Sequence, residues 1–175
     1  MAPAERYGYT VARLRAMGNR LLDESAYQRI LDSEDLESAL KVLGETVYSS
    51  WIVDMKSNRD FDQAIEAELL YVYSEIEKFV PEKRLVEVCR VPYDFHNIKV
   101  LIKSHILQKE GKDRRFNLLT PLGNIPKDDL IMAVESEDYR LLPYGLHTVL
   151  PKSLALWEQT KDILEVEKDL DTQQY

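Results

Sequence analysis

The stretch from Pro92 to Leu107 constrains the fold of this chain more than any other part of the sequence, because its apolar residues recur three and four positions apart. The recurring residues are Phe95, Ile98, Leu101, Ile102 and Ile106, with Lys99 and Lys103 on another side. That spacing places them along one face of an α-helix. Proline fixes φ and needs no amide partner, so Pro92 suits a first turn, where Asp94 would meet the positive end of the helix dipole. The sequence therefore predicts a helix that begins at Pro92 and buries one face.

Helical spacing recurs along most of the chain and predicts an all-α fold. The further helices are expected at residues 7–22, 25–31, 33–43, 60–80, 84–91, 126–134 and 151–170. Ser25 and Ser33 are expected to cap free amides at helix starts, as is Thr10 if the first helix starts late. Residues 84–91 also fit an alternating strand pattern, but helices on both sides favour a helix. Residues 47–53 contain β-branched and aromatic residues without evident partner strands, so we expect a connector packed on the core.

Charged and turn-forming residues divide the chain into two predicted segments. Residues 109–115 form a highly charged loop with a glycine, and residues 120–126 add two prolines and another glycine. Such composition is typical of a boundary between compact units. We therefore predict a first helical unit at residues 1–110, followed by a loop and a partial second helical unit at residues 111–175.

A weak internal repeat also favours two helical units. Asp35 and Leu36, followed by a loop and a long helix, are paralleled by Asp129 and Leu130, which are followed in the same way. The second copy stops soon after its long helix begins. We therefore expect a truncated version of a repeated architecture, with an apolar edge after Tyr175 through which the fragment could dimerise.

Charge and cysteine content argue against several classes of protein. The formal net charge of −8 argues against a nucleic-acid partner, because such proteins gain most of their affinity from clustered Lys and Arg. Cys89 is the single cysteine, which excludes an intrachain disulfide and fits a reducing, intracellular compartment. No stretch approaches the roughly 20 apolar residues of a transmembrane helix. A role at a membrane would therefore depend on other proteins.

No catalytic or cofactor-binding motif is evident in the sequence. Glycine loops that cradle phosphates and serine-nucleophile signatures are both missing. The adjacent Asp128 and Asp129 would point about 100 degrees apart on a helix, so they do not converge on a substrate. Cys89, His96 and His105 are residue types that bind metals, but their spacing matches no compact zinc motif, and a buried cysteine with surface or core histidines explains them better. We therefore predict no catalytic residue, no cofactor and no metal site.

Three regions of the sequence occur together in a known family. They are Ala12–Met17 with Leu21–Leu22 near the start, then Leu43–Tyr48, and finally Tyr93–Lys99. In order and approximate spacing they resemble the C subunit of V-type (archaeal-type) ATP synthases, which corresponds to the d subunit of eukaryotic vacuolar proton pumps. Polypeptides of that family are about twice as long and consist of three similar helical units. The resemblance implies that this chain is an amino-terminal portion.

The resemblance also implies a function without catalysis. In that family the subunit belongs to the central stalk of a rotary motor. It is a socket that receives the foot of the central shaft on the cytoplasmic end of the membrane ion-translocating ring. ATP synthesis or hydrolysis, coupled to transport of hydrogen or sodium ions, occurs in other subunits. Its expected partners are the shaft and ring subunits, and it would be cytoplasmic and peripherally associated with the membrane through them. The alternative is a soluble helical adaptor or scaffold that binds a peptide or helix in a groove.

Five residues are candidates for partner binding. Arg13 and Arg15 either form a solvated face with local ion pairs or reach an acidic partner. Asp94 and Asn97 either cap amides and hydrogen-bond a neighbouring helix, or face a polar cavity that a partner uses. Lys99 completes the set, because it lies on the polar side of the helix in the Tyr93–Lys99 motif.

Overall fold

The computed structural model describes residues 3–53, 55, 57 and 60–174, and every regular element in that part of the chain is helical. The predicted all-α fold is thereby confirmed. The chain divides into two compact units, Met1–Val86 and Glu87–Tyr175. The boundary between these units lies earlier in the chain than the boundary between the predicted segments 1–110 and 111–175. The reason is that the long helix that crosses residue 86 packs against the loop and helices that follow it. The sequence repeat behind the predicted segments stays a prediction.

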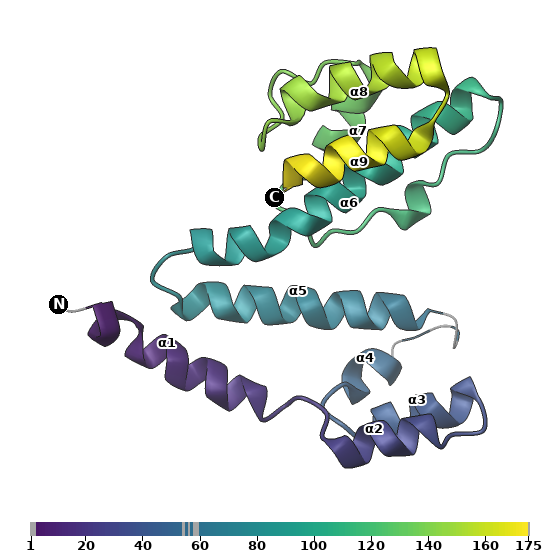
Figure 1. Ribbon diagram of the computed structural model, residues 1–175. Coiled ribbons are helices and arrows are strands. Elements are labelled where there is room, and N and C mark those ends of the chain that lie inside the picture. Colours follow the sequence, from purple (N-terminus) through teal and green to yellow (C-terminus); the bar gives the residue numbers. More distant parts are fainter. Residues whose placement is uncertain (1–2, 54, 56, 58–59, 175) are drawn as a thin grey trace. The chain divides into compact units, whose positions relative to one another are not determined.

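In the described part of unit 1, five helices lie between Pro3 and Phe79 (Figure 1). They are α1 (Pro3–Gly18), α2 (Glu24–Leu31), α3 (Leu36–Gly44), α4 (Ser49–Val53) and α5 (Phe61–Phe79). The long helix expected at residues 60–80 is confirmed by α5. Residues 47–53 were expected as a connector packed on the core; Ser49–Val53 form the short helix α4, and its Trp51 and Ile52 are half-buried.

Aspartates, and not the predicted serines, cap α2 and α3. The Asp23 carboxylate accepts a hydrogen bond from Ala26 N, and the Asp35 carboxylate accepts one from Ser38 N, both at 2.8 Å. A carboxylate at the N-cap also interacts favourably with the helix dipole, which a serine hydroxyl does less well. The prediction of Ser25 and Ser33 as caps was therefore wrong. The Ser33 hydroxyl instead donates to Arg29 O at the end of α2.

Thr10 joins α1 to α5 and does not cap a helix. Because α1 begins at Pro3, Thr10 lies inside the helix, where its side chain is buried. Its hydroxyl donates to the Phe79 carbonyl at 3.0 Å. Tyr9 packs edge-on against the Phe79 ring, with centroids 6.3 Å apart. A buried hydroxyl thus uses a carbonyl at the end of α5, which has no partner within its own helix.

Unit 2 is built around one buried helical face. Its elements are α6 (Arg84–Lys109), the 3-10 turn η1 (Phe116–Leu118), α7 (Lys127–Glu135), α8 (Leu146–Thr160) and α9 (Ile163–Gln174). The predicted stripe on α6, Phe95 through Ile106, is confirmed, with exposed fractions of 0 to 7%. It packs into one core with Leu130 of α7, Leu146 and Leu150 of α8, and Leu170 of α9. Figure 1 shows α9 between α8 and α6.

Two prolines expected to open helices lie inside them. Pro92 falls in the interior of α6, which begins at Arg84, and Pro151 falls in the interior of α8. An interior proline removes one backbone hydrogen bond, a cost that core packing on both sides can offset. The single helix expected at 151–170 is two helices, because Lys161 adopts a left-handed conformation with φ 57°. Its amide donates to Trp157 O at 2.7 Å and its ammonium lies 4.2 Å from the Trp157 ring centroid.

Candidate functional site: the α6 lock and the unit 1 cavity

The polar residues of α6 bind the loop that follows it. We call this arrangement the α6 lock, and define it as Arg90, Asp94 and Asn97 of α6 together with residues 118–125. Asp94 and Asn97 are both 0% exposed, although they are among the most polar residues of the helix. Buried polar groups are costly unless they are hydrogen-bonded. The loop supplies the hydrogen-bond partners that the apolar core lacks.

Asp94 binds the loop at two points. Its Oδ1 accepts from Ile125 N at 2.9 Å, and its Oδ2 accepts from Asn124 Nδ2 at 3.1 Å. Burial raises the pKa of the Asp94 carboxyl, whereas these bonds and the nearby Arg90 charge act in the opposite direction. The expected cap at a helix start was therefore wrong, because α6 begins ten residues earlier, at Arg84. The carboxylate satisfies amides of a loop instead.

Asn97 pairs with a single loop residue through both of its amide atoms. Its Nδ2 donates to Thr120 O at 2.8 Å, and its Oδ1 accepts from Thr120 N at 2.9 Å. This pairing satisfies a buried donor and a buried acceptor of the backbone at once. The prediction that Asn97 bonds a neighbouring helix was wrong. Its partner is an extended segment, whose backbone N–H and C=O groups at Thr120 are not used by a helix.

Arg90 and Gly123 complete the lock. The Arg90 guanidinium donates to Leu122 O and to Gly123 O, both at 2.8 Å. Gly123 passes directly over Asp94, and an added Cβ would overlap the carboxylate. His96, on the exposed side of α6, places Nε2 3.0 Å from Leu118 O. Arg90 and Gly123 were missed by sequence reasoning, although Arg90 lies four residues before Asp94, and thus on the same helix face.

The remaining candidate residues lie apart from the lock. Arg13 and Arg15 are exposed on α1, and the Arg13 guanidinium lies 5.4 Å from the Phe79 ring centroid. Lys99 forms an ion pair with Asp171 of α9. Arg13 and Arg15 belong to unit 1, whereas Asp94, Asn97 and Lys99 belong to unit 2. Partner binding by these five residues stays a prediction.

A cavity of about 500 Å³ lies in unit 1. Its walls come from α1, α3, α4 and α5 and are apolar, including Leu14, Met17, Leu43, Ile52, Leu69 and Val72. One wall carries a buried carboxylate, Glu68, whose Oε2 accepts from Trp51 Nε1 at 2.6 Å. Arg20 Nη2 lies 3.4 Å from the other oxygen.

Sequence reasoning missed Glu68 as a residue of the apolar stripe of α5. Its position three residues after Ile65, and four from both Ala64 and Val72, places it within that stripe. That spacing was the available signal, and the structure shows the side chain buried.

Within the described residues there is no group of three or more His, Cys, Asp or Glu side chains placed to hold a metal ion. Cys89 is exposed, contrary to the buried position expected for it, because it lies on the side of α6 opposite the core. Among the helices that the structure describes, none is long and apolar enough to cross a membrane.

The fold and the lock define a class of chain: an assembly of packed helices whose polar contacts serve to hold the chain together. Comparison with known proteins specifies the family. The model of the ATP synthase (C/AC39) subunit family matches residues 10–175, and the chain belongs to this family.

Individual relatives agree with this assignment. The chain is 27% identical over 176 residues to the C subunit of the A-type ATP synthase of Methanocaldococcus jannaschii, a match that covers 94% of this chain and 44% of the relative. It is 28% identical to the C subunit of the A-type ATP synthase of Methanosphaera stadtmanae, a match that covers 97% of this chain and 44% of the relative. It is 25% identical over 93 residues to the C subunit of the V-type sodium ATPase of Enterococcus hirae, and this match covers 53% of this chain and 28% of the relative. The chain thus spans less than half the length of these relatives.

Proposed function

We propose that this chain belongs to a non-catalytic central-stalk subunit of a rotary A/V-type ATP synthase or ATPase. In this role it is a socket, on the cytoplasmic side, that couples the central shaft to the membrane ion-translocating ring. The observation that carries the proposal is the family match over residues 10–175, together with relatives that are named as the C subunits of such enzymes.

The packing of unit 2 suits a part that transmits torque. A coupler must deform little under load, and protein interiors packed to crystal-like density resist deformation. The α6 lock adds five hydrogen bonds between buried or half-buried helix side chains and backbone atoms of residues 120–125. These bonds fix the loop to the helix that carries the core.

The five candidate residues take two roles in this proposal. Arg13, Arg15 and Lys99 contact partner subunits, because each carries a charge that solvent reaches and each lies in a segment that carries the family resemblance, Ala12–Met17 or Tyr93–Lys99. Asp94 and Asn97 act through the loop that they hold, because their side chains are fully buried. Charges at the edge of an interface mainly set the association rate and orientation.

The experiment that tests this function is affinity purification of the full-length native gene product from its own cells. The tagged protein is extracted gently from solubilised membranes, and co-purifying proteins are identified by mass spectrometry. We expect shaft and ring subunits of the rotary enzyme. Recovery from the soluble fraction alone, without ATPase subunits, would contradict the proposal and favour the helical adaptor.

Two lysines of α6 provide a matched pair for the contact residues. Lys99 and Lys103 lie one turn apart, and both pair with acids of α9, Asp171 and Glu167. We expect Lys99→Ala to reduce the recovered partner subunits several-fold and Lys103→Ala to leave recovery unchanged. Equal recovery with both variants would remove Lys99 from the proposed contacts without affecting the family assignment.

A further inference from the structure

Unit 1 buries far fewer apolar side chains than unit 2. The buried apolar cluster of the described residues runs from Phe95 to Leu170 and thus lies in unit 2. In the described part of unit 1, the buried apolar side chains are Leu40, Ala64 and Val86. Large apolar side chains of unit 1 that solvent reaches include Tyr9, Val11, Leu14, Leu21, Leu31 and Ile65. Exposed apolar surface on this scale is typical of a site that another molecule covers.

The unit 1 cavity opens to solvent as a groove between α1 and α5, which we call the unit 1 groove. The two helices meet where Thr10 bonds Phe79 O, and they lie further apart toward α4 (Figure 1). The wall residues Leu21 and Ile65 are 70% and 54% exposed, so the groove is open along that side.

The α5 wall of the groove has the length of a short helix. Its apolar residues are spaced three and four positions apart, and they are Ile65, Leu69, Val72 and Ile76. At 1.5 Å per residue this stripe is about 16 Å long, or about three helical turns. A groove of apolar stripes at this spacing is the kind that accepts the apolar face of a helix.

The buried carboxylate in the groove is already satisfied within unit 1. Glu68 Oε2 accepts from Trp51 Nε1, and Oε1 lies 3.4 Å from Arg20 Nη2. A buried charge that lacked a partner would require a charged group from the ligand. Since Glu68 has its partners, the side chains inserted into the unit 1 groove need only be apolar.

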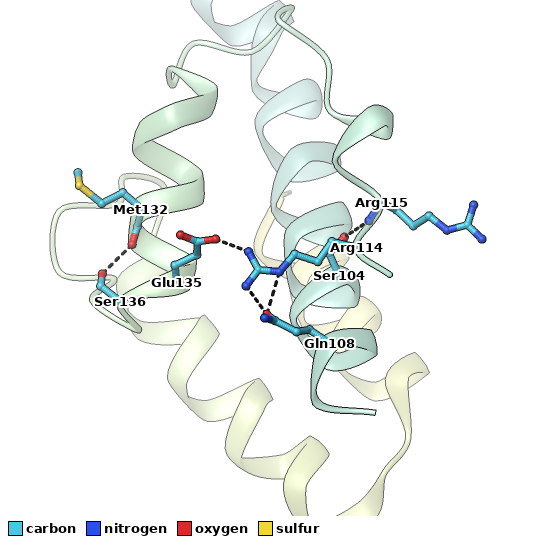
Figure 2. Close-up of polar contacts among 7 residues, drawn as sticks. All are labelled: Ser104, Gln108, Arg114, Arg115, Met132, Glu135 and Ser136. Carbon is cyan, nitrogen blue, oxygen red and sulfur yellow. Dashed lines mark hydrogen bonds and ion pairs between the residues drawn. The ribbon is translucent and has the colours of Figure 1, made fainter. Parts of the chain in front are cut away.

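The α1 edge of the groove carries a cation that is available for pairing. Arg15 follows the wall residue Leu14 and is exposed, and its guanidinium forms no hydrogen bond or ion pair within the described residues. Arg114 of unit 2, in contrast, is held between Gln108 and Glu135, as Figure 2 shows. A cation at the rim of apolar surface favours a partner with acids at the matching edge.

The α5 edge of the groove carries the opposite charge. Asp62 is exposed and lies three positions before the wall residue Ile65, so it borders the same face of α5. A helix that fits both edges therefore has acids along one side of its apolar face and bases along the other.

We propose that the unit 1 groove binds an amphipathic α-helix of a partner protein. The apolar face of this helix covers Leu21 and Ile65 and fills the cavity. Its acidic edge lies along Arg15, and its basic edge lies along Asp62. This surface adds to the proposed function without depending on it, because it is formed by residues of unit 1 alone.

Binding of labelled synthetic peptides to this 175-residue chain, measured by fluorescence anisotropy, tests the proposal. The probe is an amphipathic peptide of about four turns, with leucines on one face, glutamates on one edge and lysines on the other. One control peptide has lysines on both edges, and a second has the residues of the probe in scrambled order. We expect saturable binding of the probe, severalfold weaker binding of the peptide with two lysine edges, and no saturable binding of the scrambled peptide.

Substitutions at exposed wall positions locate the site with little effect on the fold. We expect Leu21→Gln and Ile65→Gln each to weaken binding of the probe about tenfold, through loss of an aliphatic contact. Leu31→Gln, at an exposed position of α2 outside the groove, is the control and should change binding by less than about twofold. Arg15→Glu should weaken binding of the probe and strengthen binding of the peptide with two lysine edges.

Several results would overturn the proposal. They are equal binding of the probe and the scrambled peptide, equal effects of Leu21→Gln and Leu31→Gln, or a shift of both peptides in the same direction in Arg15→Glu. Dimerisation of the chain in sedimentation that is lost in Leu21→Gln would show that a second copy covers the groove. Binding of the dye anilinonaphthalenesulfonate without binding of the probe would show that the groove takes a small apolar molecule. Circular dichroism checks that each variant folds, and the three peptides on the wild type decide the question if a variant does not.

Discussion

Gly123 lies so close to Asp94 that a Cβ at position 123 would overlap the carboxylate, 3.1 Å from its Cγ and 3.3 Å from the Asp94 backbone nitrogen. The backbone nitrogen cannot move without disturbing α6. We therefore expect Gly123→Ala to lower the free energy of unfolding by about 1–3 kcal/mol, as overpacking of a buried site does. Urea denaturation followed by circular dichroism measures the change.

Gly8 provides the control for that substitution. A Cβ at Gly8 would meet nothing within 4 Å, and the residue lies inside α1. Gly8→Ala should therefore be neutral or stabilise by up to about 1 kcal/mol, because alanine favours the helix. Equal losses in the two variants would mean that the close approach of Gly123 to Asp94 has no energetic importance.

Asn97→Ala should cost about 2–4 kcal/mol of unfolding free energy, because it leaves the N–H and C=O of Thr120 without partners in a buried place. Each such group costs about 1–3 kcal/mol. Asn19→Ala, at an exposed position, is the control and should be neutral. A loss below about 1 kcal/mol for Asn97→Ala would indicate that water replaces both bonds.

The ion pair between Lys99 and Asp171 should be weak by itself. The Asp171 side chain is 55% exposed, so solvent screens the charges. A double-mutant cycle with alanine at both positions should give a coupling energy of about 0.2–1 kcal/mol that decreases when the salt concentration is raised. The parallel cycle at Lys103 and Glu167 should give a similar value. A coupling above about 2 kcal/mol would show that the pair is effectively buried.

Removal of the Glu68 carboxylate should destabilise unit 1. Glu68→Ala leaves Trp51 Nε1 without its acceptor, for which we expect a loss of about 1–3 kcal/mol and altered Trp51 fluorescence in a Trp157→Phe background. Glu68→Gln keeps an acceptor oxygen and should lose less unfolding free energy than Glu68→Ala. Glu66→Ala, one of the neighbouring acids on α5, is the control. The interpretation fails if Glu66→Ala and Glu68→Ala are equally costly.

Tyr139 should make the chain sensitive to alkali. Its hydroxyl is buried without a hydrogen-bond partner in the described structure, and burial raises its pKa to about 12 from 10. Between these values the unfolded state loses the proton first, so stability should fall as the pH rises from 10 toward 12. Tyr139→Phe should reduce this loss and cost little at neutral pH. Thermal melts at neutral pH and at two values between 10 and 12 measure both effects.

Apolar spacing was sufficient to predict the buried face of α6 and the long helix α5. The stripe from Phe95 to Ile106 and the range of α5 follow directly from residues three and four positions apart. Helix boundaries were less predictable, because Pro92 and Pro151 have the same local preference for a first turn whether or not packing extends the helix before them. Tertiary contacts decided those positions, and sequence spacing does not contain them.

The polar site was only partly predictable. Asp94 and Asn97 were recognised as important polar residues, but their partners in residues 120–125 lie more than 20 positions away in the sequence. No periodicity connects a helix side chain to the backbone of a distant loop. Glu68, in contrast, could have been found, since its spacing on α5 already placed it among apolar residues.

The α6 lock distributes mutational tolerance unequally between its two sides. Arg90 and Asn97 bind only backbone atoms of the loop in the bonds described above, and Asp94 adds a single side-chain partner, Asn124. Every residue type except proline offers the same N–H and C=O, so the helix side chains cannot distinguish most substitutions in the loop. In a saturation library, substitutions at the three helix positions should remove bonds outright, whereas those at Leu118 or Pro121 should act through packing alone. Apart from Gly123 and Asn124, the information that fixes the loop is therefore encoded in the helix.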